Sequence, residues 1–373
     1  MIAVAKKESR EIFRDPITLG IAILLPVIMM FLFSYAITLD VREIRLAVLD
    51  QDRSSESREY VSSFLESGYF RLTAYASNPK DIEQRLDQGT VRMALIVPPD
   101  FSTRLRQGLS SEVQTLLDGS FANTVIVASN YVAAIDEIQN ARLQSYYLAQ
   151  RFGPLELARA IKAEPRVRYN PGLRSANFII PGLFAVILMA FPPMLTALAV
   201  VREKERGSIK QIFASPIKSW EFISGKMLPY TGIAFLEMLL LLEVGRLWFS
   251  VAVLGSVPLL LGLSWLYVAC TVGIGLLVST LTKSQVVAVL LAIILTLMPS
   301  FLFSGFLFPI ASMPEVFRYY TYLFPARYFN EIARGIVLKG IGLYHLWFSA
   351  ALLVVYAAAV LTCAAMRFSK KIG

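Results

Sequence analysis

Long stretches without a charged side chain constrain what this chain can fold into more than any other feature of its sequence. A helix of about 20 consecutive apolar residues crosses a bilayer. Five uncharged stretches exceed that length: Pro16–Leu39, Ser175–Val201, Leu247–Thr282, Ser284–Pro314 and Gly340–Met366. The segment 227–250 is also apolar, although it carries three charged residues. We therefore expect six membrane spans, at about 17–38, 177–200, 227–250, 259–281, 285–308 and 345–366.

The composition agrees with this prediction. Of the 373 residues, 56% are hydrophobic and only 17% are charged, and the mean hydropathy is +0.58. These values are typical of a membrane protein and exclude a soluble one. Both cysteines, Cys270 and Cys363, fall in predicted spans and indicate no disulfide framework. The first span is longer than the apolar core of a signal peptide, so we expect it to stay as an anchor.

Basic residues predict the orientation of the spans. If the N-terminus is cytoplasmic, every cytoplasmic segment is basic, whereas the loop after the third span has no Lys or Arg. The positive-inside rule therefore places both termini in the cytoplasm. The basic residues of the cytoplasmic segments are Lys6, Lys7, Arg10, Arg14, Arg202, Lys204, Arg206, Lys210, Lys218, Lys226, Lys283, Arg367, Lys370 and Lys371. Much of the net charge of +9 lies in these segments, where it meets anionic lipid. A nucleic-acid partner is therefore not needed to explain the charge.

The segment 41–170 differs in kind, because it is charged and mixed in composition. Predicted strands at 45–49, 70–76, 91–97 and 112–117 alternate with helices at 54–66, from 78, from 98 and at 121–151. This alternation predicts a compact α/β domain between the first two spans, on the extracytoplasmic side. No glycine-rich phosphate-binding motif follows a strand, so we do not expect a nucleotide site in the domain.

The rest of the chain divides around this domain. Residues 1–15 are expected to form a cytoplasmic interfacial helix, 16–40 the first span, and 171–373 a transmembrane domain of five spans. A charged island follows the second span, and Ile209, Ile212, Phe213 and Ile217 recur at helical spacing within it. This pattern predicts a helix at 203–217 lying on the membrane surface.

The segment 309–344 is rich in aromatic residues and is interrupted by Pro and Gly. Irregular backbone cannot face lipid, so this segment must be interfacial or buried in protein. The alternative is a plain aromatic belt at the membrane surface.

Several of these blocks resemble type-2 ABC exporter permeases, in particular the subgroup with a large extracytoplasmic loop in bacterial multidrug and polyketide resistance systems. The matching blocks are Lys7-Glu8 to Asp15-Pro16, the charged island with Gly207-Ser208 and Ser215-Pro216-Ile217, Tyr169-Asn170-Pro171, and Ser304 to Gly340. By this resemblance the segment 203–217 is a coupling helix that contacts an ATPase subunit. Its expected contact residues are Glu203, Glu205, Gly207, Ser208, Ile209, Phe213 and Pro216.

The resemblance also implies an outer-face structural motif in a re-entrant or interfacial segment, made of Pro309, Met313, Pro314, Pro325, Arg327, Lys339 and Gly340. It further implies a bacterial inner-membrane protein that pairs with a second permease subunit, as a homo- or heterodimer. Each permease would bind an ABC ATPase that supplies ATP and Mg²⁺, and spans one, two and five would line the path. A periplasmic adaptor protein is a further expected partner. The chain itself would be no enzyme.

Charged residues inside the third span carry the main alternative. Glu237, Glu243 and Arg246 are costly in hydrocarbon and should face protein or water. Glu243 and Arg246 are three apart and could pair, and Glu237 is either structural or on the transport path. An ion- or proton-coupled secondary transporter using Glu237 and Glu243 therefore remains open, although no internal repeat is visible. A signalling receptor would need a larger cytoplasmic domain, and the single histidine, His345, supports no metal site.

Overall fold

A computed structural model describes residues 1–37, 43–120, 122–152, 168–170, 174–207 and 219–367. Its contacts divide the chain into two units. One unit is helical and combines Met1–Thr38 with Arg166–Gly373, and the other is Leu39–Pro165.

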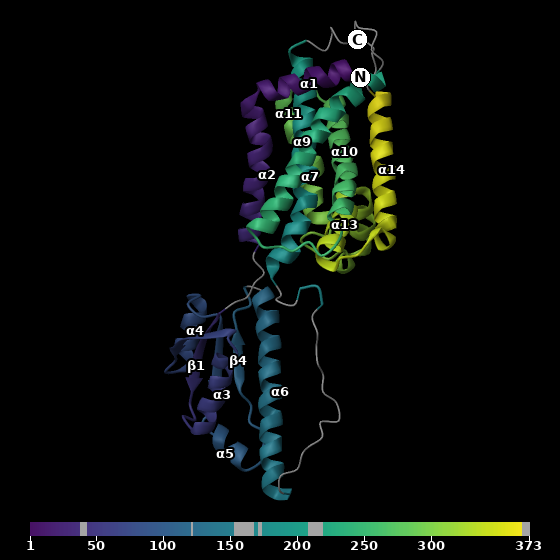
Figure 1. Cartoon of the computed structure of the whole chain (residues 1–373). Helices are drawn as coiled ribbons and strands as arrows, with labels where there is room; N and C mark the ends of the chain where they lie inside the picture. The colour runs from purple at the N-terminus through teal and green to yellow at the C-terminus, as the bar shows by residue number, and fades with distance from the viewer. Residues whose placement is uncertain (38–42, 121, 153–167, 171–173, 208–218, 368–373) are drawn as a thin grey trace. The chain divides into compact units, whose positions relative to one another are not determined.

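The helical unit confirms the prediction of six spans. Six of its helices are long and apolar enough to cross a membrane. They are α2 (Pro16–Ala36), α7 (Ser175–Glu205), α9 (Ser219–Leu247), α10 (Val257–Leu281), α11 (Gln285–Phe303) and α14 (Leu343–Arg367). The N-terminal α1 (Ile2–Arg14) lies across one end of this unit, and α13 (Pro325–Lys339) lies at the opposite end (Figure 1).

The helix α7 forms the core of the unit. It packs against α2, α9, α10, α11 and α13, and every residue from 179 to 193 is buried. The helix α10 approaches α7 closely, because a Cβ on Gly275 would overlap the carbonyl oxygen of Pro193. Atoms do not approach so closely, so this contact requires glycine. By contrast, α2 and α11 have few buried residues, and most of their apolar side chains are exposed or half-buried.

The ends of α1, α2 and α7 follow from local chemistry. Asp15 separates α1 from α2 and caps α2, because its side chain accepts a hydrogen bond from the backbone of Thr18 at 3.0 Å. Pro16 follows as the first helical residue of α2. At the C-terminal end of α7, Gly207 has φ +73° and its N–H donates to the carbonyl of Lys204. This left-handed glycine ends the helix.

The segment 309–344 contains short helices instead of a clean span. In order they are η1 (Ile310–Ser312), α12 (Glu315–Tyr320), η2 (Thr321–Leu323) and α13. One face of α13 is buried against α7, α10 and α14, and Phe329 stacks on Tyr267 of α10 with ring centroids 4.1 Å apart. Protein thus covers one face of α13, whereas η1 and α12 have no buried residues.

The second unit is a small α/β structure. Its elements are β1 (Ile44–Asp50), α3 (Ser55–Glu66), β2 (Phe70–Tyr75), α4 (Pro79–Asp87), β3 (Met93–Val97), α5 (Phe101–Arg106), β4 (Gln114–Leu117) and α6 (Ala122–Phe152). The strand order is β2-β1-β3-β4, in which β1 is parallel to both neighbours and β4 is antiparallel to β3. Helices α3, α5 and α6 cover one face of the sheet, and α4 covers the other.

Candidate functional site

Charged side chains from three helices meet at the end of the helical unit where α1 lies. We call this group the ionic cluster, and it consists of Lys7, Glu8 and Glu11 from α1, Glu203 from α7 and Lys226 from α9. Lys226 Nζ lies 2.9 Å from Glu8 Oε1 and 2.7 Å from Glu203 Oε2. Lys7 binds Glu203 as well and lies 3.2 Å from Glu11 Oε1. The cluster therefore joins α1 to both spans.

The burial of the ionic cluster makes the loss of any one partner energetically costly. The side chain of Lys226 is fully buried and that of Glu8 is 2% exposed. An unpaired buried charge is strongly destabilising, so these groups depend on each other. Burial opposes the charge of Lys7, but the hydrogen bond and the negative charge of Glu203 outweigh it and raise the pKa of Lys7 above its usual value. Lys7 therefore stays protonated.

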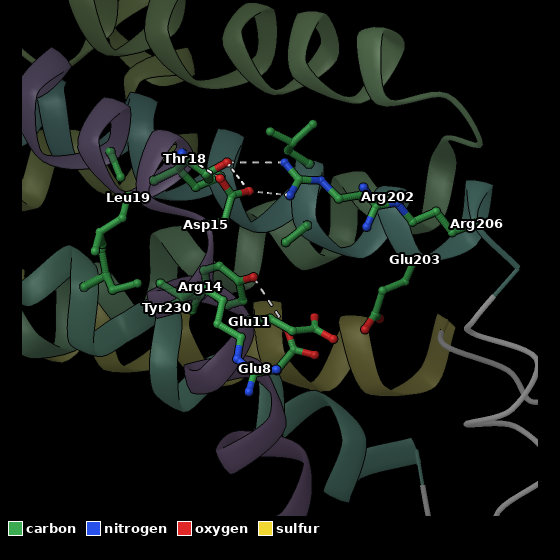
Figure 2. A pocket seen from close by; sticks show the side chains of 16 residues that line it. Glu8, Glu11, Arg14, Asp15, Thr18, Leu19, Arg202, Glu203, Arg206 and Tyr230 are labelled. Atoms are coloured by element: carbon green, nitrogen blue, oxygen red, sulfur yellow. Dashed lines mark hydrogen bonds and ion pairs between the residues drawn. The ribbon is translucent and has the colours of Figure 1, made fainter.

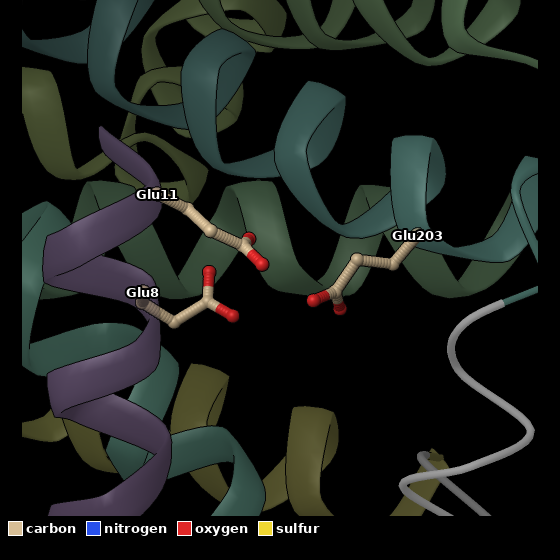
Figure 3. Close-up of side chains that lie close together, drawn as sticks. All are labelled: Glu8, Glu11 and Glu203. Atoms are coloured by element: carbon tan, nitrogen blue, oxygen red, sulfur yellow. The ribbon is translucent and has the colours of Figure 1, made fainter. Parts of the chain in front are cut away.

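Figure 3 shows how the carboxylates of Glu8, Glu11 and Glu203 converge. Their oxygen atoms lie within 4.8 Å of one another, a spacing that metal sites also show. Here the ammonium groups of Lys7 and Lys226 already bind these carboxylates. These two ammonium groups offset two of the three negative charges, and the group acts as a junction between helices.

A second ionic contact ties α7 to the boundary between α1 and α2. Arg202 Nη1 lies 2.8 Å from Asp15 Oδ2, and the hydroxyl of Thr18 donates to the same carboxylate at 2.6 Å. The hydrogen bonds from Thr18, together with that from Arg202, lower the pKa of Asp15 to about 2. Asp15 therefore caps α2 as a carboxylate and holds the end of α7.

The predicted coupling residues fall into three groups: one is buried, two lie at the exposed end of α7, and the others lie outside the described residues. The span α7 continues through Glu205, so Glu203–Glu205 belong to it and not to a separate surface helix. Glu203 is buried in the ionic cluster, because Lys7 and Lys226 draw its carboxylate inward. Glu205 is exposed and accepts a 2.7 Å hydrogen bond from the backbone of Gln285 at the start of α11, while Gly207 terminates α7. Ser208, Ile209, Phe213 and Pro216 lie outside the described residues.

The two glutamates of the third span are in different surroundings. Glu237 is 2% exposed, and neither carboxylate oxygen has a hydrogen-bond partner among the described residues. Glu243 is half exposed and pairs with Arg246 at 3.1 Å, as their spacing suggested. Glu237 is therefore the chemically unusual residue of the two.

The predicted outer-face motif has structural roles in its local fold. Pro309 and Met313 flank η1, Pro314 precedes α12, and Pro325 is the first residue of α13. Arg327 binds the hydroxyl of Thr321 and lies over the Tyr322 ring, 3.8 Å from its centroid. Lys339 is the last residue of α13, and Gly340, with φ +65°, caps it.

The sequence interpretation missed the ionic cluster. Lys226 is one of the basic residues that predict the orientation of the spans, and Glu8 lies in the predicted interfacial helix at 1–15. One signal was present, since Lys226 directly precedes the apolar segment 227–250, where an ammonium group needs a partner. That partner is Glu8, 218 positions away, and no local pattern identifies it.

The fold defines a polytopic membrane protein whose helical unit receives a small α/β insertion after its first span. Residues 16–366 match the family described as ABC-2 family transporter protein. The chain belongs to this family of transporter membrane domains.

Three bacterial relatives extend this result. The chain is 34% identical over 340 residues to the probable multidrug ABC transporter permease YbhS of Escherichia coli strain K12, covering 91% of this chain and 88% of the relative. It is 29% identical over 367 residues to the probable multidrug ABC transporter permease YbhR of the same strain, covering 98% and 97%. It is 28% identical over 335 residues to the inner membrane transport permease YhhJ, also of that strain, covering 88% and 86%.

Proposed function

We propose that this chain is the permease subunit of an ATP-driven exporter in a bacterial inner membrane, with both termini in the cytoplasm. A separate ABC ATPase would bind ATP and Mg²⁺, and two permease subunits would pair. The observation that carries the proposal is α7, a span at the core of the helical unit that runs without interruption to Gly207. The predicted coupling segment follows directly, so a force applied there by the ATPase would be transmitted to the core of the helical unit.

The ionic cluster connects the helices through which this force would be transmitted. Glu203 and Lys226 lie at the ends of the two spans that flank the segment 208–218, and α1 binds Glu203 through Lys7 and Lys226 through Glu8. Glu205 connects the same end of α7 to α11. Movement of the coupling segment would therefore reach four helices together. The exposed apolar faces of α2 and α11 are available for the second subunit or for lipid.

For the substrate we propose a set of chemical classes and no single compound. Two relatives are named as multidrug permeases, which supports a drug-like, lipid-like or cationic substrate moved out of the cytoplasm or inner membrane. We place the α/β unit outside the cytoplasm, where it could bind a periplasmic adaptor.

The test is co-purification of the tagged permease with the ATPase encoded beside it, followed by ATPase measurements in lipid nanodiscs. We expect Glu205→Ala/Phe213→Ala to lose the ATPase or to abolish its stimulation by the permease. A matched control is Glu315→Ala/Phe317→Ala, which removes the same side-chain types from α12 at the opposite end of the unit. The proposal fails if no ATPase binds, or if purified permease transports a substrate without one.

Glu237 supports a second candidate, an ion- or proton-coupled secondary transporter. Its carboxyl is buried in a span and has no hydrogen-bond partner in the described part of the chain. Such an arrangement is costly and is often functional. Glu243 contributes less to this candidate, because Arg246 already neutralises it. Proton or cation uptake into liposomes that is lost in Glu237→Gln and retained in Glu243→Gln, without an ATPase, would favour this candidate over the exporter.

A further inference from the structure

A pocket of about 300 Å³ lies beside the ionic cluster, between α1, α2, α7 and α9. This volume is at the lower end of the range for small-ligand sites. Its polar lining residues are Glu8, Glu11, Arg14, Asp15, Thr18, Arg202, Glu203, Arg206 and Tyr230 (Figure 2). Its apolar lining residues are Ile12, Leu19, Ala22, Leu195, Leu198, Ala199 and Ile233. The pocket is thus half charged and half apolar, as an amphiphile requires.

The pocket lining alone has four carboxylates and three arginines, and the two lysines that bind its glutamates bring the described cations to five. The described carboxylates that line it are Glu8, Glu11, Asp15 and Glu203, and the described cations in or against it are Lys7, Arg14, Arg202, Arg206 and Lys226. Every one of these carboxylates already has a cationic partner: Arg202 binds Asp15, and the two lysines bind the three glutamates.

Two of the cations at the pocket have no ion-pair partner among the described residues. Neither Arg14, at the end of α1, nor Arg206, just past α7, forms an ion pair with a described residue, although both guanidinium side chains line the pocket. Guanidinium groups bind phosphate oxygens strongly, through paired charge-assisted hydrogen bonds. The polar half of the pocket is therefore suited to a phosphate group.

The apolar half specifies the rest of the ligand. Leu19 and Ala22 of α2 face Leu195, Leu198 and Ala199 of α7 across the pocket, and these residues lie within spans. An acyl chain can follow them while the headgroup stays with the arginines at the span ends. Basic pockets between membrane helices bind anionic lipid headgroups in this way.

We propose that this pocket is a binding site for an anionic phospholipid, whose phosphate is held by Arg14 and Arg206 and whose acyl chain lies between α2 and α7. The bound lipid would lie beside the ionic cluster, and so would bear on the junction of α1 with α7. The site does not depend on an ATPase, and its test separates it from the proposed function.

The experiment titrates short-chain phosphatidylglycerol into the purified full chain in detergent and measures binding by thermophoresis. We expect Arg14→Gln/Arg206→Gln to bind about 25-fold more weakly, from about fivefold per arginine. Arg14→Lys/Arg206→Lys should keep most of the affinity, because the charge is retained. The matched control is Arg10→Gln/Arg367→Gln, which removes two exposed arginines at the same end of the unit but outside the pocket; it should bind like the wild type.

Three results would overturn the proposal. Equal losses in the pocket variant and the control would mean that binding follows overall charge. Equal affinity for phosphatidylcholine of the same chain length would remove the requirement for an anionic headgroup. Displacement of the lipid by inorganic phosphate at similar concentrations would identify free phosphate as the ligand and leave the apolar half unused.

Discussion

At the scale of single residues, Lys226 is the side chain with the largest consequence. It is one of the largest fully buried side chains in the described structure, and it pairs with Glu8 and Glu203 from two other helices. Replacing a whole buried ion pair by apolar groups can be neutral, whereas removing one partner strands the others. Lys226 thus holds two carboxylates that have little access to water.

We predict that Lys226→Met destabilises the permease by about 3–5 kcal/mol, because Glu8 and Glu203 would lose their shared cation. In detergent this corresponds to a fall in melting temperature of about 10 °C. Lys6→Met, an exposed lysine on α1, is the control and should change the melting temperature little. Equal melting temperatures for the two variants would contradict a stabilising role for the ionic cluster.

At the scale of elements, the contact between α7 and α10 is set by backbone proximity. Gly275 leaves no room for a side chain against Pro193, whereas a Cβ on Gly262, in the same α10, would meet nothing within 4 Å. The two glycines occupy one helix and differ only in what they face, so they form an internal comparison.

We predict that Gly275→Ala destabilises the helical unit by about 1–3 kcal/mol, since α10 must move away from α7. Gly262→Ala should be neutral or stabilising by up to about 1 kcal/mol, because alanine favours the helix more than glycine does. Thermal unfolding of both variants in one detergent measures the difference. If both variants shift in the same direction by the same amount, helix propensity and not packing governs this position.

The elements also show what the sequence could reveal. The six spans and the alternating strands and helices of the α/β unit follow from local composition and spacing, and these signals survive without knowledge of tertiary contacts. The continuation of α7 through Glu205 was not predicted, because its charged residues read as the start of a new surface helix. The ionic cluster was missed for a different reason, because its partners lie far apart in the chain: Lys7 and Glu203 are separated by 196 positions.

At the scale of the whole molecule, the chain consists of two units of opposite character. The helical unit exposes apolar side chains along α2, α9, α11 and α14, which suits lipid or a second subunit. The α/β unit instead has its own apolar core on both faces of the sheet and a charged surface. Such a pair of units fits a membrane domain that carries a water-exposed insertion.

We predict that the α/β unit and α1 lie on opposite sides of the membrane. In a Cys270→Ser/Cys363→Ser background, Lys80→Cys in the exposed part of α4 should react with an impermeant maleimide in intact spheroplasts. Lys6→Cys in α1 should react only after the membrane is permeabilised. Both positions are exposed, so accessibility differs only by side. Labelling of Lys6→Cys in intact spheroplasts would reverse the assigned orientation.

The ionic cluster has a consequence for biosynthesis. Glu8 leaves the ribosome early, but its partner Lys226 follows 218 positions later. At about 5–20 residues per second, the N-terminal helix waits roughly 10–40 s for its counterion. During that interval Glu8, Glu11 and Lys7 of α1 must stay hydrated, so α1 cannot dock until the third span has arrived. Closure of this junction therefore reports that the first three spans of the newly made membrane domain are in place.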